Sequence, residues 1–599
     1  MRNLHKVVAL IALSGMCLGA QAPSDGDAAA KKSTKQHAVH ATKKVEPAKR
    51  DETSEKLREL KEMIERQQSS LQQVQQQLRD TQQQLQQTQQ QLSSTQQTAQ
   101  HADATAIAVE TNSNLQVQKV QADLSDVKIE VTTANQDAKL AVKKAEDLEH
   151  PLALHYKDVT ITPGGFLAAE SVWRQHGTGS DINTPFNSIN FPGADAYHQS
   201  EFFGSGRQSR LSVLVEGKLK SAKLNGYYET DWLGTGVTSN NNQSNSYVNR
   251  MRQLYGQAAL SNGVTFTGGQ MWSLVTETKK GVDNRTEATP MVIDPQYAVG
   301  FSWARQYGFR VSKNFDNKVW LAASVENPQT TLSAKNAAAN FNFGEPGVGG
   351  GLYNLNATYA FNEAPDVVVK AAFEPGFGHY EVFGLMSQFR DRVYPNATAA
   401  TPSAAGAYND SRTGGGIGVN ARAGFFDKRL DIGLHFLDGK GIGRYGTSGL
   451  PDTTVRPDGT LAPLRSGQGL GTIEWHSARF DVYGYGGAEY VGRYSLLNSA
   501  GKGVGYGVPT VDNSGCFTET VPGDATGVTP GTAANCTANT RSLIEGTFGF
   551  WYKPYNGSKG RVQFGPQYSY LVRETWAGKG GAPHTIDNMF FTSFRYYIP

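Results

Sequence analysis

Charged side chains alternate with apolar residues along the C-terminal three-quarters of the chain. In residues 428–437, for example, Arg429, Asp431 and His435 alternate with Leu430, Ile432, Leu434 and Phe436. An arginine guanidinium offers paired donors in a planar fork, so it suits carboxylate or phosphate ligands. The candidate residues of this polar face are the basic Arg210, Arg310, Arg390, Arg422, Arg573 and Arg595 and the acidic Glu216, Glu229, Asp231, Asp481, Glu489 and Glu545.

Two interpretations of this polar face remain open. Where it lines a water-filled passage, basic and acidic groups on opposite walls set up a field that selects among ions. Alternatively, the arginines pair with neighbouring acids and only stiffen the wall. Alternation assigns no face to four further arginines near predicted strand ends, Arg207, Arg250, Arg252 and Arg305.

Catalytic motifs are missing from the sequence. It contains no HExxH, GxSxG or Walker motif, and His435, His476 and His584 stand apart from one another. A barrel phospholipase would need a serine and a histidine with an asparagine or aspartate near the lipid. We therefore expect no enzymatic activity, no cofactor and no bound metal.

The mature chain is expected to keep two cysteines, Cys516 and Cys536, in a stretch rich in glycine, threonine and proline. An even pair in an exported protein indicates a disulfide bond that closes one long surface loop. A zinc site is disfavoured because no histidine lies at ligand spacing.

The polar face belongs to strands, because from about residue 160 the hydrophobic period is two. Segments of about ten residues are joined alternately by very short and very long connections, as in outer-membrane barrels. Aromatic residues gather at segment ends, for instance Trp232, Trp272 and Tyr552, which is typical of the interfacial girdles of membrane proteins. A soluble sandwich would also alternate, but these two features favour the membrane.

Counting connections predicts sixteen antiparallel strands around an aqueous lumen. The short turns fall at 220–223, 261–263, 314–317, 375–378, 426–428, 476–478 and 554–560, and the long connections at 174–206, 234–248, 274–298, 327–365, 392–413, 439–466, 492–541 and 574–587. A strand at 353–361 would raise the count to eighteen. One long loop should fold inward; its composition favours 327–365, with 274–298 as the second choice.

The N-terminal region reads as a signal, a tether and a coiled coil. Residues 1–22 have a basic end, an apolar stretch and small residues at the cleavage site, which favours secretion over lipidation at Cys17. Residues 23–55 form a flexible basic linker, either a solvated spacer or a binder of peptidoglycan. Residues 56–150 form a coiled coil, because apolar residues recur every seven positions at Leu57, Ile64, Leu71, Leu78, Leu85 and Leu92 and, after a shift of phase, at Val120, Leu124 and Val127.

Composition narrows the classes further. The net charge of +3 gives no general argument for binding nucleic acid. A helix with one apolar seam needs partners, so the chain is expected to be an oligomer, and we favour a homotrimer. The barrel domain then occupies 155–599, in outer-membrane lipid and lipopolysaccharide, with the coiled coil in the periplasm.

Several short motifs resemble the DcaP-like trimeric porins of Gram-negative bacteria. They are RQSRL at 207–211, RMRQLYG at 250–256, GGQMWS at 268–273 and APDVV at 364–368. The resemblance implies a periplasmic coiled coil before a sixteen-stranded barrel, and passive diffusion of small hydrophilic solutes with a preference for anions such as dicarboxylates. The chain departs from the pattern in its Tyr-Tyr-Ile-Pro terminus, its long coiled coil and its two cysteines.

A second hypothesis is a structural tether, in which the N-terminal region reaches peptidoglycan and a largely closed barrel serves as an anchor. A trimeric autotransporter is disfavoured because this single chain supplies enough strands for its own barrel.

Overall fold

The computed structural model of the protein describes residues 153–236, 239–241, 245–347, 357–519 and 535–599, together with the single residues Thr81, Gln86, Lys119, Leu124 and Lys128. Contacts divide the chain into two compact units, 1–152 and 153–599. Leu124 of the predicted coiled-coil seam is helical and half-buried. The other seam residues, Leu57, Ile64, Leu71, Leu78, Leu85, Leu92, Val120 and Val127, lie outside the described residues, as do the predicted signal and linker.

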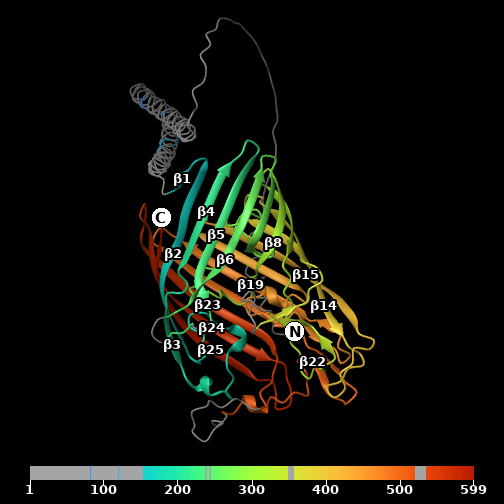
Figure 1. Cartoon of the computed structure of the whole chain (residues 1–599). Helices are drawn as coiled ribbons and strands as arrows, with labels where there is room; N and C mark the ends of the chain where they lie inside the picture. Colours follow the sequence, from blue (N-terminus) through green and yellow to red (C-terminus); the bar gives the residue numbers. More distant parts are fainter. Residues whose placement is uncertain are drawn as a thin grey trace, which may run out of the picture. The chain divides into compact units, whose positions relative to one another are not determined.

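The second unit is a closed antiparallel β-barrel (Figure 1). Its main sheet has nineteen strands, of which β1 (Leu154–Tyr156), β3 (Glu201–Ser205) and β10 (Phe341–Asn342) are short extensions, leaving sixteen. The first strand, β2, pairs with the last, β25, and closes the sheet. The barrel strands are β2 (Val159–Arg174), β4 (Arg210–Lys218), β5 (Ala222–Gly234), β6 (Val248–Leu260), β7 (Val264–Trp272), β8 (Arg305–Phe315), β9 (Val319–Glu326), β13 (Asp366–Phe373), β14 (His379–Val393), β15 (Tyr408–Phe425), β16 (Leu430–Lys440), β19 (Arg465–His476), β20 (Phe480–Val491), β23 (Thr540–Gly557), β24 (Gly560–Thr575) and β25 (His584–Tyr597).

The predicted count of sixteen is therefore confirmed. In the described part of 353–361, β12 (Thr358–Ala360) pairs with β11 (Gly344–Pro346) in a separate two-stranded sheet rather than joining the barrel. Two further small sheets, β17 (Thr453–Val455) with β18 (Leu461–Pro463) and β21 (Tyr494–Leu497) with β22 (Gly503–Tyr506), belong to long connections.

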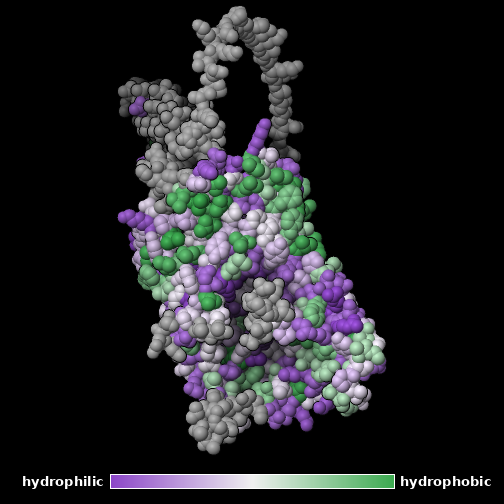
Figure 2. All heavy atoms as spheres, in the orientation of Figure 1, coloured by the Kyte–Doolittle hydropathy of each residue, from purple (hydrophilic) through white to green (hydrophobic). Residues whose placement is uncertain are grey.

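Successive residues of each strand face opposite sides of the barrel wall. On β14, Val382 and Met386 are 50% and 46% exposed on the outside, whereas Glu381 and Ser387 are each 1% exposed on the inside. Figure 2 shows hydrophobic residues gathered over the upper part of the wall, where Figure 1 places β4, β5 and β8. An apolar exterior and polar interior are what a membrane barrel requires. Among the described residues, no helix is long and apolar enough to cross a membrane.

The barrel has a short-turn end and a long-loop end. All seven predicted short turns join consecutive barrel strands, as between β8 and β9, where Asp316 and Asn317 adopt positive φ. We number the long connections L1 to L8; they cover residues 175–200, 235–247, 273–304, 327–365, 394–407, 441–464, 492–539 and 576–583.

L3, the second choice from composition, enters the lumen. L3 contacts inward side chains of β13, β14, β15, β20, β23 and β24, as the site below details. For L4, the first choice, the described residues contact other loops at the long-loop end instead: the Thr331 amide donates to Asp452 of L6 and the Lys335 amide donates to the Gly505 carbonyl of L7.

Candidate functional site

The lumen is the candidate site, and L3 divides it. On one side, inward carboxylates of the wall accept backbone amides of the loop. The Val299 N–H donates to Glu545 at 2.8 Å, and the Gly300 N–H donates to Glu489 at 2.9 Å. A buried carboxylate that accepts such donors fixes a loop more firmly than a neutral acceptor does. The two predicted acids therefore hold the second half of L3.

The first half of L3 is held by charged residues of β13 to β15. Lys370 and Glu381 form an ion pair of 2.8 Å with both side chains fully buried. Thr278 of L3 donates its hydroxyl to Glu381 at 2.5 Å, and Lys370 donates to the Thr276 carbonyl at 2.8 Å. Glu277, also of L3, pairs with Arg422 at 2.9 Å. These contacts satisfy charges that would be costly to bury alone.

Apolar packing fills the lumen beside β20, β23, β24 and β25, which we call the packed side. Its cluster joins Ile182, Phe186 and Ile189 of L1 and Val292, Ile293, Val299 and Phe301 of L3 to inward Tyr483, Leu543, Trp551, Leu571, Met589 and Phe591 of the wall. Most of these side chains are excluded from solvent. Apolar residues on the inner face are thus a docking surface for loops.

The wall formed by β4 to β8, which β2 joins to β25 of the packed side, carries arginines and is called the arginine side. Arg252 binds Glu229 at 2.7 Å and Asp231 at 2.8 Å, and donates to the Tyr297 hydroxyl of L3 at 3.2 Å. Glu229 lies opposite Gln253 and Thr230 lies opposite Met251, so Arg252 is the extra residue of a β-bulge. A bulge re-aims side chains that strict alternation would place outside.

A cavity of about 550 Å³ remains between L3 and the wall. Its lining includes Arg210, Glu229, Lys279, Pro290, Tyr297, His476, Asp481, Arg561, Gln563 and Arg595. The lining comes both from L3 and from the barrel wall. It extends to His476 and Tyr597 near the short-turn end. Its polar groups give a hydrophilic compartment inside the barrel.

The basic groups of this cavity differ in how far they are neutralised. Arg595 pairs with Glu170 at 2.8 Å, and Arg210 lies 3.7 Å from Glu229. Neither Lys279 nor Arg561 forms an ion pair with a described carboxylate, although the Arg561 guanidinium stacks on Tyr597 with its carbon 4.0 Å from the ring centre. The unpaired charge in the cavity is therefore positive.

The predicted polar-face residues lie mostly inside. Arg310 donates to the Trp272 carbonyl at 2.7 Å, and Arg573 donates to the Ile189 carbonyl of L1 at 2.6 Å. The inward set also contains Arg210, Arg422, Arg595, Glu216, Glu229, Asp231, Asp481, Glu489 and Glu545. Glu216 lies near the short-turn end, paired with Lys223 at 2.5 Å, and Asp481 pairs with Lys553 at 2.8 Å.

Arg390 is the exception, because it shares the outer face of β14 with Val382 and Met386. It donates to the carbonyls of Phe361 and Asn362 in L4 at 3.3 and 3.4 Å. The predicted inward position is wrong because the strand is one residue out of the assumed phase, and a one-residue slip exchanges the two faces.

Sequence reasoning missed several charged residues of the lumen. Arg174 is fully buried and binds Glu201 at 2.9 Å, and Glu170 is the partner of Arg595. Lys370, Glu381 and Arg561 also face inward. The alternation of apolar and polar residues in β2, β13, β14 and β24 could have placed these residues inside. The inward direction of Arg252 depends on the β-bulge instead.

Two carboxyls of L3 have shifted pKa values. Burial raises the pKa of Glu277 to about 7, although the neighbouring Arg422 acts in the opposite direction. Burial likewise raises the pKa of Asp294 to about 6 against hydrogen bonds from Thr184 and Gln296. L3 therefore carries groups that titrate near neutral pH.

Cys516 and Cys536 are joined by a disulfide bond in L7, with Cα atoms 4.7 Å apart. Within the described ranges, no group of three or more histidine, cysteine, aspartate or glutamate side chains could hold a metal ion.

No family model and no curated protein sequence matches the chain. Among solved structures it is similar to the outer-membrane channel DcaP of Acinetobacter baumannii, with a TM-score of 0.50 and 14% identity over 74% of this chain and 99% of that chain. The anion-selective porin from Comamonas acidovorans matches at a TM-score of 0.37 and 8% identity over 74% of this chain and 100% of that chain. OmpF of Salmonella typhi in complex with daunomycin matches at a TM-score of 0.38 and 9% identity, over 74% of this chain and 100% of that chain. The barrel has the fold of the DcaP channel.

Proposed function

We propose that the protein is a passive diffusion channel for small hydrophilic solutes in the outer membrane of a Gram-negative cell. The observation that carries the proposal is the polar cavity of about 550 Å³ inside a closed barrel, narrowed by an inward loop. A barrel of sixteen strands is wide enough for an aqueous lumen, whereas eight strands would be filled by side chains. An apolar outer face supports insertion in a bilayer.

We further propose a preference for anions such as dicarboxylates. Lys279 and Arg561 line the cavity and pair with no carboxylate of the described residues, so they are available to a carboxylate in transit. Unpaired cations in a constriction raise the local concentration of anions and lower their barrier. The fold shared with DcaP supports a channel but does not identify the solute.

Single-channel recording of the purified chain in a planar bilayer with a salt gradient tests both statements. The expected result is stepwise conductance with a reversal potential on the anion side. The double variant Lys279→Gln/Arg561→Gln should move that potential towards cations. A folded barrel without conductance steps would refute the channel, and an unmoved potential would refute the anion site.

The channel is proposed to be a homotrimer, held by the heptad region 56–150 in the periplasm. Recordings should then show conductance steps in groups of three. Deleting 56–150 should leave monomeric barrels in detergent, measured by light scattering, whereas trimers that persist would place the assembly contacts in the barrel.

A second candidate function is a tether between outer membrane and peptidoglycan. The observation in its favour is the apolar cluster of the packed side, which fills part of the lumen with loops L1 and L3. Sedimentation with purified peptidoglycan tests it: binding should be lost on deleting 28–50, and a silent barrel that still binds would favour the tether over the channel.

A further inference from the structure

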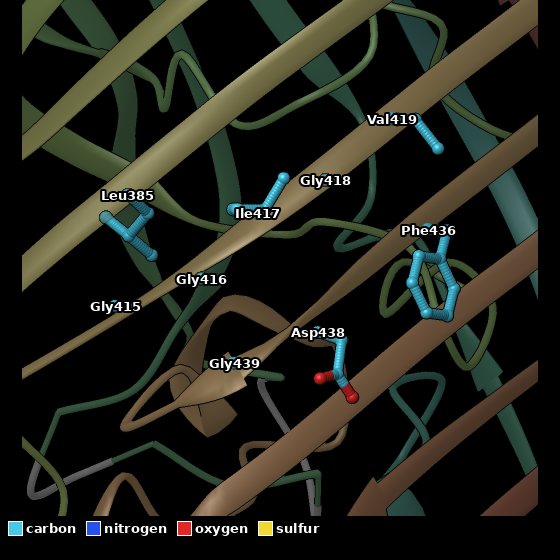
Figure 3. A pocket seen from close by; sticks show the side chains of 9 residues that line it. All are labelled: Leu385, Gly415, Gly416, Ile417, Gly418, Val419, Phe436, Asp438 and Gly439. Atoms are coloured by element: carbon cyan, nitrogen blue, oxygen red, sulfur yellow. The ribbon is translucent and has the colours of Figure 1, made fainter.

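An apolar groove of about 620 Å³ lies on the outer face of the barrel between β15 and β16. Figure 3 shows Ile417, Phe436 and Asp438 around it, and Gly415 and Gly439 without side chains on the same strands. Ile417 is 69% exposed and Phe436 is 42% exposed. The groove is lined mainly by apolar atoms and backbone, so its floor suits a hydrocarbon chain.

A second pocket, of about 350 Å³, lies at the long-loop end of the same strands. Five basic residues line it, namely Arg412, Lys440, Arg456, Arg465 and Arg493, and no acidic residue does. Strands β15, β16 and β19 supply Arg412, Lys440 and Arg465, whereas L6 supplies Arg456 and the start of L7 supplies Arg493. Such a concentration of guanidinium and ammonium groups matches a phosphate dianion.

Most of this charge is not neutralised. Arg412 pairs with Asp410 at 2.9 Å, and Arg465 with Asp438 at 3.4 Å. Lys440, Arg456 and Arg493 form no ion pair with a described carboxylate. Instead Arg456 donates to the Tyr494 hydroxyl at 2.8 Å, and Arg493 to the Ala577 carbonyl at 2.8 Å, which holds both guanidinium groups in place.

The groove and the basic pocket adjoin each other along β16. Asp438 lines the groove, and its partner Arg465 lines the basic pocket. Along β16, Gly439 of the groove is followed directly by Lys440 of the pocket. Lys440 and Arg465 share the outer faces of their strands with Phe436 and Ile473, so these two cations face away from the lumen, whereas Arg412 lies on the inward face of β15 with its partner Asp410.

We propose that this surface is a binding site for a phosphorylated lipid of the outer leaflet, with a phosphate in the basic pocket and an acyl chain in the groove. The inference rests on the proposed outer-membrane location, which sets the long-loop end outward. A lipid satisfies both halves at once, whereas a free anion would leave the groove empty. A second copy of the chain would need an acidic patch to match five cations.

Binding of bisphosphorylated lipid A to the full chain in detergent micelles tests the site. In Lys440→Gln/Arg493→Gln we expect affinity at least about tenfold weaker, because two charge-assisted contacts to phosphate are lost. In Ile417→Trp, which fills the groove from an exposed position, lipid A binding should also fall. The matched control Lys502→Gln removes an exposed lysine of L7 outside the pocket and should bind normally.

Two further ligands separate the sources of the anion. Dephosphorylated lipid A should bind about as weakly to the native chain as to the charge variant. Inorganic phosphate in excess over lipid A should not displace it from the site. Tight binding of inorganic phosphate, unaffected by Ile417→Trp, would overturn the lipid site, as would loss of oligomers in either variant, which would assign the surface to contacts between copies.

Conductance keeps this test separate from the proposed function. None of the substituted residues lines the cavity in the lumen, so single-channel conductance should match that of the native chain and confirm that the barrel is folded. Unchanged lipid A affinity in a conducting variant would refute the lipid site alone. A silent native barrel that binds lipid A would refute the channel and leave the lipid site standing.

Discussion

On the packed side of the lumen, inward residues of β20 and β23 to β25 hold L1 and L3 through apolar contacts. On the arginine side, charged inward residues of β4 to β8 reach L3 through the Arg252–Tyr297 contact, and Trp272 of β7 is the residue of this wall that joins the apolar cluster. Both walls follow the same alternation of faces. The comparison shows that facing inward does not decide whether a side chain meets water, because L1 and L3 cover part of the packed side, whereas other inward residues of both walls line the cavity.

This difference also separates two uses of charge. On the packed side, Glu489 and Glu545 accept hydrogen bonds from backbone amides of L3. On the arginine side and along the cavity, some cations form ion pairs with carboxylates. Lys279 and Arg561 form none with a described carboxylate. Substitutions on the two sides should therefore affect stability and selectivity differently.

The largest effect is expected at Arg252, whose replacement by methionine leaves Glu229 buried without its closest cation. Removing one partner of a buried ion pair costs about 3–5 kcal/mol. The matched variant on the packed side is Arg573→Met, which loses hydrogen bonds to the Ile189 carbonyl and the Thr540 hydroxyl and a cation–π contact with Phe191, about 1–3 kcal/mol. Urea unfolding of detergent-folded barrels measures both; equal losses would contradict the distinction between the two sides.

The next effect is expected at Gly300, where L3 docks against the packed side. Gly300 has φ +89°, and an added Cβ would lie 2.1 Å from the Gly469 carbonyl oxygen. Gly300→Ala therefore costs about 2 kcal/mol or more and should raise single-channel conductance by loosening L3. Gly449→Ala is the control, because its φ is +59° but nothing lies within 4 Å of the added Cβ. Equal conductance in both variants would mean that L3 does not control the passage.

A smaller change in free energy but a clear change in selectivity is expected at the cavity. Lys279→Gln and Arg561→Gln remove charges without carboxylate partners, so the free energy of unfolding should fall by less than about 1 kcal/mol. The reversal potential in a salt gradient should move towards cations in each variant. A large loss of stability with an unmoved potential would assign these residues to the structure of the wall.

The last prediction concerns pH, which acts through Asp294 of L3. The pKa of Asp294 rises from 3.8 to about 6 in the folded protein, so the folded state binds more protons than the unfolded state between these values. Stability conferred by Asp294 is therefore greatest at low pH, falls as pH rises through this window and is level above it. Hydrogen exchange of L3 amides, corrected for intrinsic rates, should show protection falling from pH 4 to 6, and Asp294→Asn should reduce that slope.

Much of the architecture could be predicted from local pattern. The period of two located the strands, and turn residues such as Asp316 and Asn317 located the short connections, because both depend on neighbouring residues. The identity of the inward loop could not be predicted from composition. L3 is inside because Glu277, Thr278 and Gly300 find partners on strands far along the chain, and such partners leave no local signal.

The site shows the same division at single residues. Alternation placed Arg422 and Glu545 inside, but it failed at Arg390, where the assumed phase was one residue out. It gave no answer at Arg252, where a bulge restores the inward direction. By itself, the sequence determined that this chain forms a sixteen-stranded barrel with a polar interior, because strand pleating converts a period of two into two faces. Only the tertiary structure decided which inward charges are neutralised and which line a cavity, because pairing depends on distances between strands and loops that are remote in sequence.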